Sequence, residues 1–314
     1  MWWTLLLACN APSYDTSFTC DAVALDAEPT WEGHPSDGWS WEKTGALFDT
    51  SPVAGDGDLA PTLFPFQGAL WMVFSRKVGV EMSLWTAHSQ DGASWSEPTP
   101  LIGVPDGAAQ YAAVAPKEGA LWMWVGSGSL DQYRSEDGLR WDLTASGVFR
   151  GREGDFDALS VLYPSVIADV VGWRMVYTGF DGATYRVGMA TSADGQVWTR
   201  GDHLALEAGD GFDNAAVAQP ALLAMEHGWW LWYGGYDTSS TNPGPWRVGL
   251  ARTLDGVFYD RMGVSVPLSE EGADAWSARD PAVAWYDGAW RMVYAGMGTD
   301  GVYRLMGARS AVCP

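Results

Sequence analysis

One aspartate stands at a position that recurs along the chain and could take part in chemistry. Four apolar segments have a proline 11 residues before their central residue, and a fifth has an alanine there. The residues that precede these positions are Ala60, Tyr111, Tyr163, Gln219 and Asp280. Asp280 is the one carboxylate among them. It could act as a base or stabilise charge, and the alternative is a buried ion pair or cap with Arg279.

Further acidic residues lie shortly before these positions. An aspartate stands seven residues before three of the prolines, at Asp157, Asp213 and Asp274. Other acidic residues close by are Asp58, Glu153, Asp155, Glu270 and Glu271. An aspartate before a strand commonly bonds its own backbone in a turn. The repeated aspartate is therefore a candidate turn residue as well as a candidate functional carboxylate.

The elements that would position these residues are strands. In the segment 162–200, Trp173, Met175 and Tyr177 alternate with residues 174, 176 and 178, and this period of two predicts a strand. An apolar strand is expected before it over 163–168 and another after it over 185–192. An Asp194-Gly195 turn then leads to a strand that ends near Trp198. Such a four-stranded meander cannot bury both of its faces alone.

The same unit recurs through the whole chain. The residues that match Met175 are Met72, Met123, Leu231 and Met292. Five antiparallel units of ~50 residues indicate an all-β fold, a five-bladed β-propeller over residues 31–314. A motif S/T-x-D-G-x-x-W/Y recurs at 89–95, 135–141, 192–198 and 253–259. We interpret its aspartate as a turn residue and its aromatic ring as packing between blades.

The two ends of the chain are expected to meet. The fifth unit lacks the motif after its third strand, and a partial copy stands at 36–43. We therefore expect an N-terminal strand to complete the last blade and close the ring, which removes free sheet edges. Closure would bring Cys20 and Cys313 together as a disulfide; the alternative is two unpaired thiols. The molecule is expected to be a monomer.

The first ten residues form a short apolar run that ends in Leu-Leu-Ala-Cys-Asn. The run resembles a bacterial lipoprotein signal, with residues 1–8 removed and Cys9 lipidated, although no Lys or Arg precedes it. An ordinary secretory signal or a mobile tail is the alternative. Residues 9–30 would then be a tether, and the protein would be exported to the cell envelope. The apolar run is too short to cross a bilayer as a helix, so membrane attachment would come through the lipid alone.

The composition excludes several classes of function. The 314 residues include 18 basic and 39 acidic side chains, for a net charge of −21, which argues against nucleic acid and anionic lipid as partners. The four histidines are scattered, so we expect neither a His-based metal site nor a Ser-His-Asp triad. No cofactor is expected. The acidic glycine-rich loops at 55–58 and 209–213 could bind Ca²⁺, but neither has the EF-hand spacing.

The five units, the A-T-S-x-D-G-x-x-W-T strand and the tripeptide Arg279-Asp280-Pro281 resemble the five-bladed β-propeller glycosidases. That superfamily includes arabinanases, β-xylosidases, levansucrases and invertases, and the phosphorylases of β-mannosides are related to it. In those enzymes an Asp-Pro in the first blade is the nucleophile or base. An Arg-Asp-Pro or a lone Asp holds the sugar or tunes the acid, and a Glu in a further blade is the general acid. The resemblance covers residues 31–313 and implies the fold; fold alone does not imply activity.

The resemblance implies a role for Asp280 and Arg279, whereas Ala60, Tyr163 and Gln219 leave the other blades without a carboxylate at that position. Glycoside hydrolysis normally needs two carboxyl groups. If the chain cleaves a glycan, Asp280 would be the base or stabiliser, and the acid would be Glu153 or Asp157. The two functions left open are a glycoside hydrolase or related phosphorylase, and a non-catalytic, surface-tethered propeller that binds a glycan or a protein.

Aromatic and polar residues in the predicted loops indicate how a sugar could be held. Tyr or Trp rings stack on the apolar face of a sugar while Asp and Asn bond its hydroxyls. The candidates for an oligo- or polysaccharide ligand are Asp58, Tyr111, Tyr163, Asp181, Gln219, Tyr236, Asp237, Trp246, Trp276 and Arg279. The alternative for each aromatic residue is packing between blades.

Overall fold

The protein is described by a computed structural model that covers residues 41–48, 53–107, 111–169, 172–225, 228–238 and 245–310. These residues form twenty β-strands and no helix. Within them, therefore, no helix is available that could cross a membrane. The predicted signal segment, the tether and Cys9, Cys20 and Cys313 lie outside the described residues.

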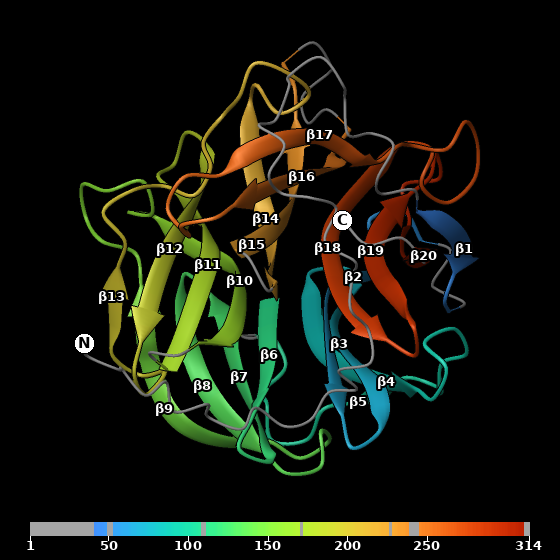
Figure 1. The fold of residues 1–314 in the computed structure, drawn as a ribbon. Helices are drawn as coiled ribbons and strands as arrows, with labels where there is room; N and C mark the ends of the chain where they lie inside the picture. The colour runs from blue at the N-terminus through green and yellow to red at the C-terminus, as the bar shows by residue number, and fades with distance from the viewer. Residues whose placement is uncertain are drawn as a thin grey trace, which may run out of the picture.

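Three sheets contain four antiparallel strands each. The first consists of β6 (Tyr111–Lys117), β7 (Ala120–Ser127), β8 (Ser129–Ser135) and β9 (Asp142–Arg150). The second consists of β10 (Ser160–Asp169), β11 (Gly172–Phe180), β12 (Tyr185–Ser192) and β13 (Trp198–Arg200). The third consists of β14 (Ala216–Met225), β15 (Gly228–Tyr236), β16 (Arg247–Thr253) and β17 (Asp260–Val266). Figure 1 shows the first strand of each sheet nearest the middle of the molecule.

The remaining eight strands form one sheet. Its first half is β18 (Ser277–Tyr286), β19 (Ala289–Met297), β20 (Tyr303–Ser310) and β1 (Glu42–Ala46). Its second half is β2 (Gly57–Phe66), β3 (Ala69–Val78), β4 (Glu81–Ser89) and β5 (Thr99–Pro100). The halves join through a single parallel pair, Gly57 with Tyr303. A Cβ at Gly57 would lie 1.9 Å from the Tyr303 carbonyl oxygen, so the close approach requires glycine.

Strand β1 comes from the start of the described chain and lies on the far side of β20. It pairs antiparallel with that strand, from Glu42 opposite Arg309 to Ala46 opposite Met306. The N-terminal and C-terminal parts of the chain thus share one sheet. Most of the segment 36–43, in which the sequence places this strand, lies outside the described residues.

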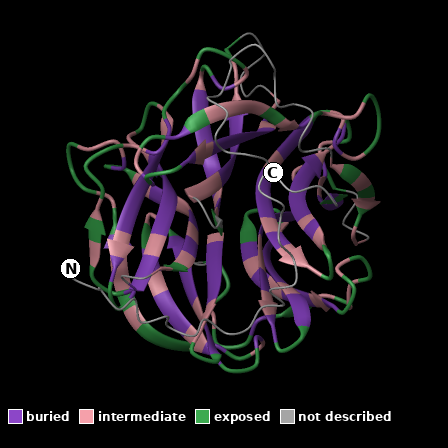
Figure 2. Ribbon diagram, viewed as in Figure 1, coloured by how far each residue is buried: buried purple, intermediate pink, exposed green. Residues whose placement is uncertain are grey.

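Neighbouring sheets are held together by clusters of buried apolar side chains. Met175 and the four residues aligned with it each lie in such a cluster, with at most 1% of their surface exposed. One cluster joins Met72 and Phe74 of β3 to Val293 of β19 and Leu305 of β20, so the two halves of the large sheet also pack on each other. Figure 2 shows burial running along the strands and exposure at the turns. Each such side chain contributes about 1.5–3 kcal/mol when fully buried.

The repeated D-G-x-x-W motif forms the same turn in four places. Asp194 Oδ1 accepts hydrogen bonds from the N–H groups of Gln196 and Val197 at 2.8 and 2.9 Å, and from the Ser192 hydroxyl at 3.1 Å. Equivalent bonds surround Asp91, Asp137 and Asp255. These backbone bonds lower the pKa of all four carboxyl groups. The predicted structural role of this aspartate is confirmed.

The aromatic residue that ends the motif packs as the sequence predicts. The Trp198 ring meets Trp124 of the adjacent sheet edge-on, with 5.8 Å between ring centroids. The indole N–H of Trp124 in turn donates to the carbonyl oxygen of Gly195 at 2.8 Å. The turn of one sheet is therefore bonded to the second strand of the sheet before it.

Candidate functional site

The residues before the prolines lie on β-bulges with an unusual backbone. Ala60, Tyr163, Gln219 and Asp280 have φ values of +51°, +46°, +57° and +51°. The register with the second strand shifts at each of them. Proline is confined to edges and bulges because it cannot donate to the ladder, so the proline that follows each residue suits the bulge. A left-handed conformation costs roughly 1–2 kcal/mol in an L residue, and the surrounding structure must hold it.

Tyr111, the remaining one of the five recurring positions, differs from the other four. It is followed by Ala112 in place of proline, and β6 pairs with β7 without a register shift. Its φ is not among the positive values. The bulge therefore accompanies the proline.

Three of these positions meet at Asp280. Its Oδ1 accepts a hydrogen bond from Arg279 Nε at 3.2 Å, and its Oδ2 accepts one from the backbone N–H of Ala60 at 3.1 Å. The Nη2 of Arg279 donates to the hydroxyl of Tyr163 at 2.8 Å. Asp280 is buried, with 3% of its surface exposed. The strands β2 and β18 of the large sheet and β10 of a second sheet thus converge on one ion pair.

Aromatic rings surround this pair. Tyr163 stacks on Tyr111 with 3.8 Å between ring centroids. The guanidinium of Arg279 lies 5.4 Å from the ring centroid of Trp246, within the range of a cation–π contact. Tyr236 meets the Trp246 ring edge-on at 4.7 Å. We call Arg279, Asp280, Tyr111, Tyr163 and Trp246 the central cluster.

Burial sets the protonation of the cluster. It raises the pKa of Tyr163 well above the ordinary value and also raises that of Tyr111. Burial is the largest single effect on Arg279 and acts to lower its pKa, but the charge of Asp280 together with Tyr163, Tyr303 and Tyr111 outweighs burial, so that the pKa is raised. At neutral pH Arg279 is therefore a cation and the two phenols of the cluster are neutral.

Gln219 lies against the same tryptophan. Its backbone N–H donates to Thr178 Oγ1 at 2.8 Å. Its side-chain Oε1 is buried and has no hydrogen-bond partner among the described residues. A Cβ added to Gly234 would lie 2.1 Å from this oxygen and 3.1 Å from Trp246 Cε3. The amide thus fits beside Trp246 because residue 234 is glycine.

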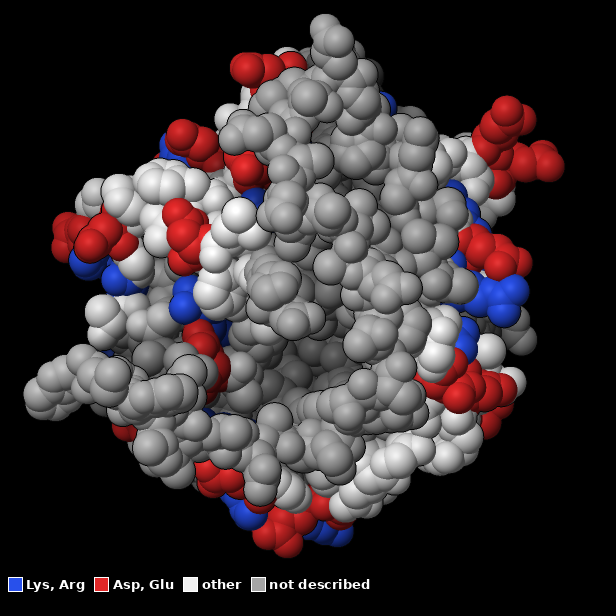
Figure 3. All heavy atoms as spheres, viewed as in Figure 1, with Lys and Arg blue, Asp and Glu red and all other residues white. Residues whose placement is uncertain are grey.

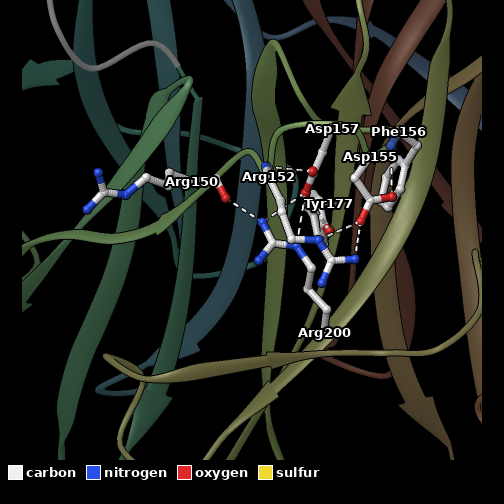
Figure 4. A network of polar contacts seen from close by, with 7 residues as sticks. All are labelled: Arg150, Arg152, Asp155, Phe156, Asp157, Tyr177 and Arg200. Carbon is white, nitrogen blue, oxygen red and sulfur yellow. Dashed lines mark hydrogen bonds and ion pairs between the residues drawn. The ribbon is translucent and has the colours of Figure 1, made fainter.

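Asp157, one of the two residues predicted as the acid, belongs to a different network, shown in Figure 4. Its Oδ2 accepts bonds from the Tyr177 hydroxyl at 3.0 Å and from Arg200 Nε at 3.1 Å. Its Oδ1 accepts the backbone N–H of Arg152 at 3.0 Å. The carboxylate is fully buried, and both of its oxygens are bonded. It ties the loop before β10 to the second and outer strands of its sheet.

The same arrangement occurs in two further sheets. Asp213 accepts bonds from the Tyr233 hydroxyl at 2.9 Å and from Arg261 Nε at 2.8 Å. Asp274 accepts bonds from the Tyr294 hydroxyl and from Lys43 Nζ, both at 2.7 Å. In all three cases the tyrosine follows the aspartate by 20 residues. Sequence reasoning missed these tyrosines, although this constant spacing could have identified them.

The basic partner in each network comes from the outermost strand of the sheet. Arg200 ends β13, Arg261 lies in β17, and Lys43 lies in β1. Strand β1 thus supplies the same contact to its sheet that β13 and β17 supply to theirs. The repeated aspartate thus has a structural role in each of these three networks, in place of the functional role that the sequence also allowed.

The structure places the other predicted site residues in ion pairs or on the surface. Asp58 is buried in a bidentate pair with Arg76, at 2.8 and 2.9 Å. Asp181 pairs with Arg186 at 2.7 Å and Asp237 with Arg247 at 3.2 Å. Glu153 is exposed in the loop before β10, and Trp276 keeps 40% of its surface exposed. Figure 3 likewise shows acidic and basic side chains next to one another around the rim.

The described residues contain no group of three or more His, Cys, Asp or Glu side chains that could hold a metal ion. Of the two loops considered for Ca²⁺, the first uses Asp56 to accept the backbone N–H of Gly79 at 2.7 Å, and its Asp58 pairs with Arg76. The second uses Asp213 in the network with Arg261.

The fold is that of the propeller glycoside hydrolases. The structure resembles BT0996 in a complex with RGII, with a TM-score of 0.72 and 17% identity over 88% of this protein and 93% of the other. It also resembles a thermostable family-43 glycoside hydrolase, with a TM-score of 0.61 and 14% identity over 83% of this protein and 92% of the other. A family-32 β-fructofuranosidase from Bombyx mori aligns with 84% of this protein and 61% of its own length, with a TM-score of 0.62 and 12% identity.

No family model matches the sequence, and no curated protein matches it. At identities of 12–17% the structural likeness establishes the fold, and the function has to be argued from the site.

Proposed function

We propose that this chain is a carbohydrate-binding protein whose ligand site is the central cluster. The observation that carries the proposal is the convergence of three strained first-strand positions, Ala60, Tyr163 and Asp280, on one buried ion pair beside Trp246. Strained backbone that the surrounding structure holds in place is commonly found at functional sites. The fold shared with glycoside hydrolases, one of them in a complex with RGII, gives independent support.

The cluster offers the groups that sugars require. Trp246 and Tyr236 supply aromatic surface for the apolar face of a sugar ring. Arg279 and the neutral phenols supply donors, and Asp280 supplies an acceptor for hydroxyl groups. These groups are few and converge, as in most small-molecule sites.

Binding without cleavage is the function that the carboxylates favour. A glycosidase normally uses two carboxyl groups about 5–10 Å apart on either side of the scissile bond. Asp280 is bonded through both oxygens, to Arg279 and to the backbone of Ala60. Asp157, one proposed partner, has both oxygens bonded in its own network, and Glu153, the other, is exposed on a loop.

Hydrolysis or phosphorolysis is the second candidate. Asp280 has a carboxylate at a strained position of a first strand. The resemblance to the propeller glycosidases implies a catalytic or sugar-holding group at this position. In that case Asp280 would act as base or stabiliser and Glu153 as acid.

One experiment tests both candidates. The purified chain is mixed with arabino-, xylo-, fructo- and manno-oligosaccharides, with and without phosphate. Binding is followed by calorimetry, and released sugar is measured. We expect binding to at least one oligosaccharide without turnover, and at least tenfold weaker binding in Asp280→Asn. Asp194→Asn, which alters a turn outside the central cluster, is the matched control and should bind as the wild type does.

The outcomes separate the candidates. Turnover that is lost in Asp280→Asn would establish an enzyme. If the chain neither binds nor cleaves any of these oligosaccharides, the carbohydrate site is rejected and a propeller that binds protein is favoured.

The wider organisation is part of the proposal. The ring would have five blades, with the large sheet divided at the Gly57–Tyr303 pair and β1 as the outer strand of the last blade. Residues 1–8 would be a lipoprotein signal, Cys9 the lipidated residue, 9–30 a tether and 31–314 one domain. A Cys20–Cys313 disulfide would join the ends of a monomer in the cell envelope. Mass spectrometry of the intact and reduced protein from membranes would test the lipid and the disulfide together.

A further inference from the structure

Five arginines at the end of the molecule that holds the central cluster are paired with carboxylates. Arg186, Arg247 and Arg304 lie at the start of β12, β16 and β20. That is the end of the sheets where the first strands begin, because the end of each second strand pairs with the start of the first. Five pairs result: Arg279–Asp280, Arg186–Asp181, Arg247–Asp237, Arg304–Asp300 and Arg76–Asp58.

This pairing makes the site unsuited to an anionic ligand. A carboxylate on a sugar would have to displace an aspartate from its arginine, and the chain as a whole carries a net charge of −21. An acidic glycan would therefore meet repulsion, and these five arginines are already paired with aspartates.

Gln219 is one of several buried polar side chains with an atom that lacks a hydrogen-bond partner among the described residues, and it is the one that lies beside Trp246. Only 3% of its surface is exposed, and its Oε1 has no donor among the described residues. A buried acceptor without a donor is unfavourable unless a ligand or water supplies the bond. The amide oxygen lies beside Gly234 and near Trp246, which belongs to the central cluster, so a donor there would be supplied at the edge of that cluster.

We propose that the ligand of the central cluster is a neutral glycan and that Gln219 Oε1 accepts a hydrogen bond from one of its hydroxyl groups. The proposal rests on the proposed function and adds the class of ligand and the residue that selects it. Sugar hydroxyls are donors as well as acceptors, whereas a carboxylate only accepts and would oppose both Gln219 Oε1 and Asp280.

The first arm of the test uses the wild-type chain. Calorimetry compares the neutral oligosaccharides with oligogalacturonides and with the same oligomers after reduction of their carboxyl groups. We expect at least one neutral sugar to bind more tightly than every acidic one. An oligogalacturonide that binds more tightly than all the neutral sugars would overturn the assignment of ligand class. Absence of binding to any glycan would instead overturn the function on which it rests.

The second arm uses Gln219→Met, which keeps the length of the side chain and removes the amide. We expect its affinity for the neutral sugar to fall about tenfold, the effect of losing 1.4 kcal/mol. Its unfolding temperature should rise by about 2 °C, because the unsatisfied acceptor is gone. A purely structural glutamine would give the opposite sign for stability and no change in affinity.

Gln132→Met is the matched control. Gln132 is a buried glutamine whose Oε1 accepts from the Thr144 hydroxyl at 2.8 Å and from Gln196 Nε2 at 3.2 Å. Its replacement should lower the unfolding temperature and leave affinity unchanged. If Gln219→Met retains wild-type affinity, the role of Gln219 is wrong even when the glycan site itself is real.

Discussion

Asp213 and Asp280 are both buried aspartates near the start of a first strand, yet they have different surroundings. Asp213 meets a tyrosine and a basic residue of the outer strand, and two other sheets repeat this set around Asp157 and Asp274. Asp280 meets Arg279 and the backbone of Ala60 in the other half of the large sheet, a combination that occurs once in the described structure.

The comparison separates architecture from function. A carboxylate that recurs with the same kinds of partner in several sheets has a structural role common to those sheets, which is the attachment of a loop to the outer strand. A carboxylate that occurs once, on strained backbone and among aromatic rings, is the better candidate for a functional role. Substitutions at the two kinds of site should therefore affect different measurements.

The largest loss of stability is expected for Asp213→Ala. It removes the acceptor of both Tyr233 and Arg261 in a buried network. Breaking a buried pair costs about 3–5 kcal/mol, and because 34% of the Arg261 side chain is exposed, we expect about 3 kcal/mol. Urea unfolding measures this loss. Asp155→Ala, which breaks the more exposed pair with Arg152, should cost less than about 1 kcal/mol. Equal losses would contradict an architectural role for the buried network.

A smaller loss is expected for Lys43→Met, which tests the outer strand β1. Lys43 Nζ donates to Asp274 at 2.7 Å, to Ser269 Oγ at 2.9 Å and to the Pro267 carbonyl at 2.6 Å. Its removal leaves Asp274 with the hydrogen bonds from Tyr294 and Ser269, and we expect a loss of about 2 kcal/mol, since the lysine is partly exposed. Lys43→Arg should retain most of the stability, because arginine fills this place in two other sheets. If the arginine variant is as unstable as the methionine variant, the three networks are not equivalent.

The third prediction concerns pH. Burial acts to raise the pKa of Asp274, but hydrogen bonds from Lys43, Tyr294 and Ser269 outweigh it and hold the pKa below its ordinary value. A depressed folded-state pKa stabilises the protein above the unfolded pKa of about 4, and this contribution is lost as the pH falls further. The gap in unfolding temperature between the wild type and Lys43→Met should therefore narrow from pH 7 to pH 3.

Lys117→Met provides the control for this prediction. Lys117 Nζ donates to the carbonyl oxygen of Gly172 at 3.1 Å and lies 4.6 Å from the Trp173 ring centroid. Neither partner titrates in this range, so the gap for this variant should not depend on pH. A gap for Lys43→Met that stays constant or widens in acid would show that the Asp274 pair does not stabilise the fold.

Much of the architecture could be predicted from the sequence because it repeats. The alternation around Met175 and the Asp-Gly turns identify strands and their order, since local backbone preferences determine both. The networks around Asp157 and Asp213 could not be predicted in the same way, because their basic partners come from outer strands 43 and 48 residues away. The partner of Asp274, Lys43, lies 231 residues away along the chain.

The geometry of the central cluster could also be predicted from the sequence only in part. Counting back from each strand identifies Tyr163, Gln219 and Asp280 as equivalent, but not their left-handed backbone, since those residue types rarely adopt it. The proline after each of them was the available signal, because proline inside a strand indicates a bulge. The contact of Arg279 with Tyr163 depends on how the sheets are arranged around one another, which no single unit specifies.

The smallest effect is expected at Ala60, and it tests whether the bulge is strained. Ala60 and Ala112 are both buried alanines near the start of a first strand, each with 7% of its surface exposed. Ala60 has a φ of +51°, whereas Ala112 lies in a regular ladder opposite Val125. Replacement by glycine removes the same methyl group from each, so the difference between the variants reports backbone conformation.

Glycine accepts positive φ without a steric cost, but it weakens a regular strand by its greater freedom in the unfolded chain. We therefore expect Ala60→Gly to be more stable than Ala112→Gly by about 1 kcal/mol in urea unfolding. Two equal losses would mean that the first-strand positions carry no strain. The distinction between Asp280 and the repeated aspartates would then rest on their partners alone.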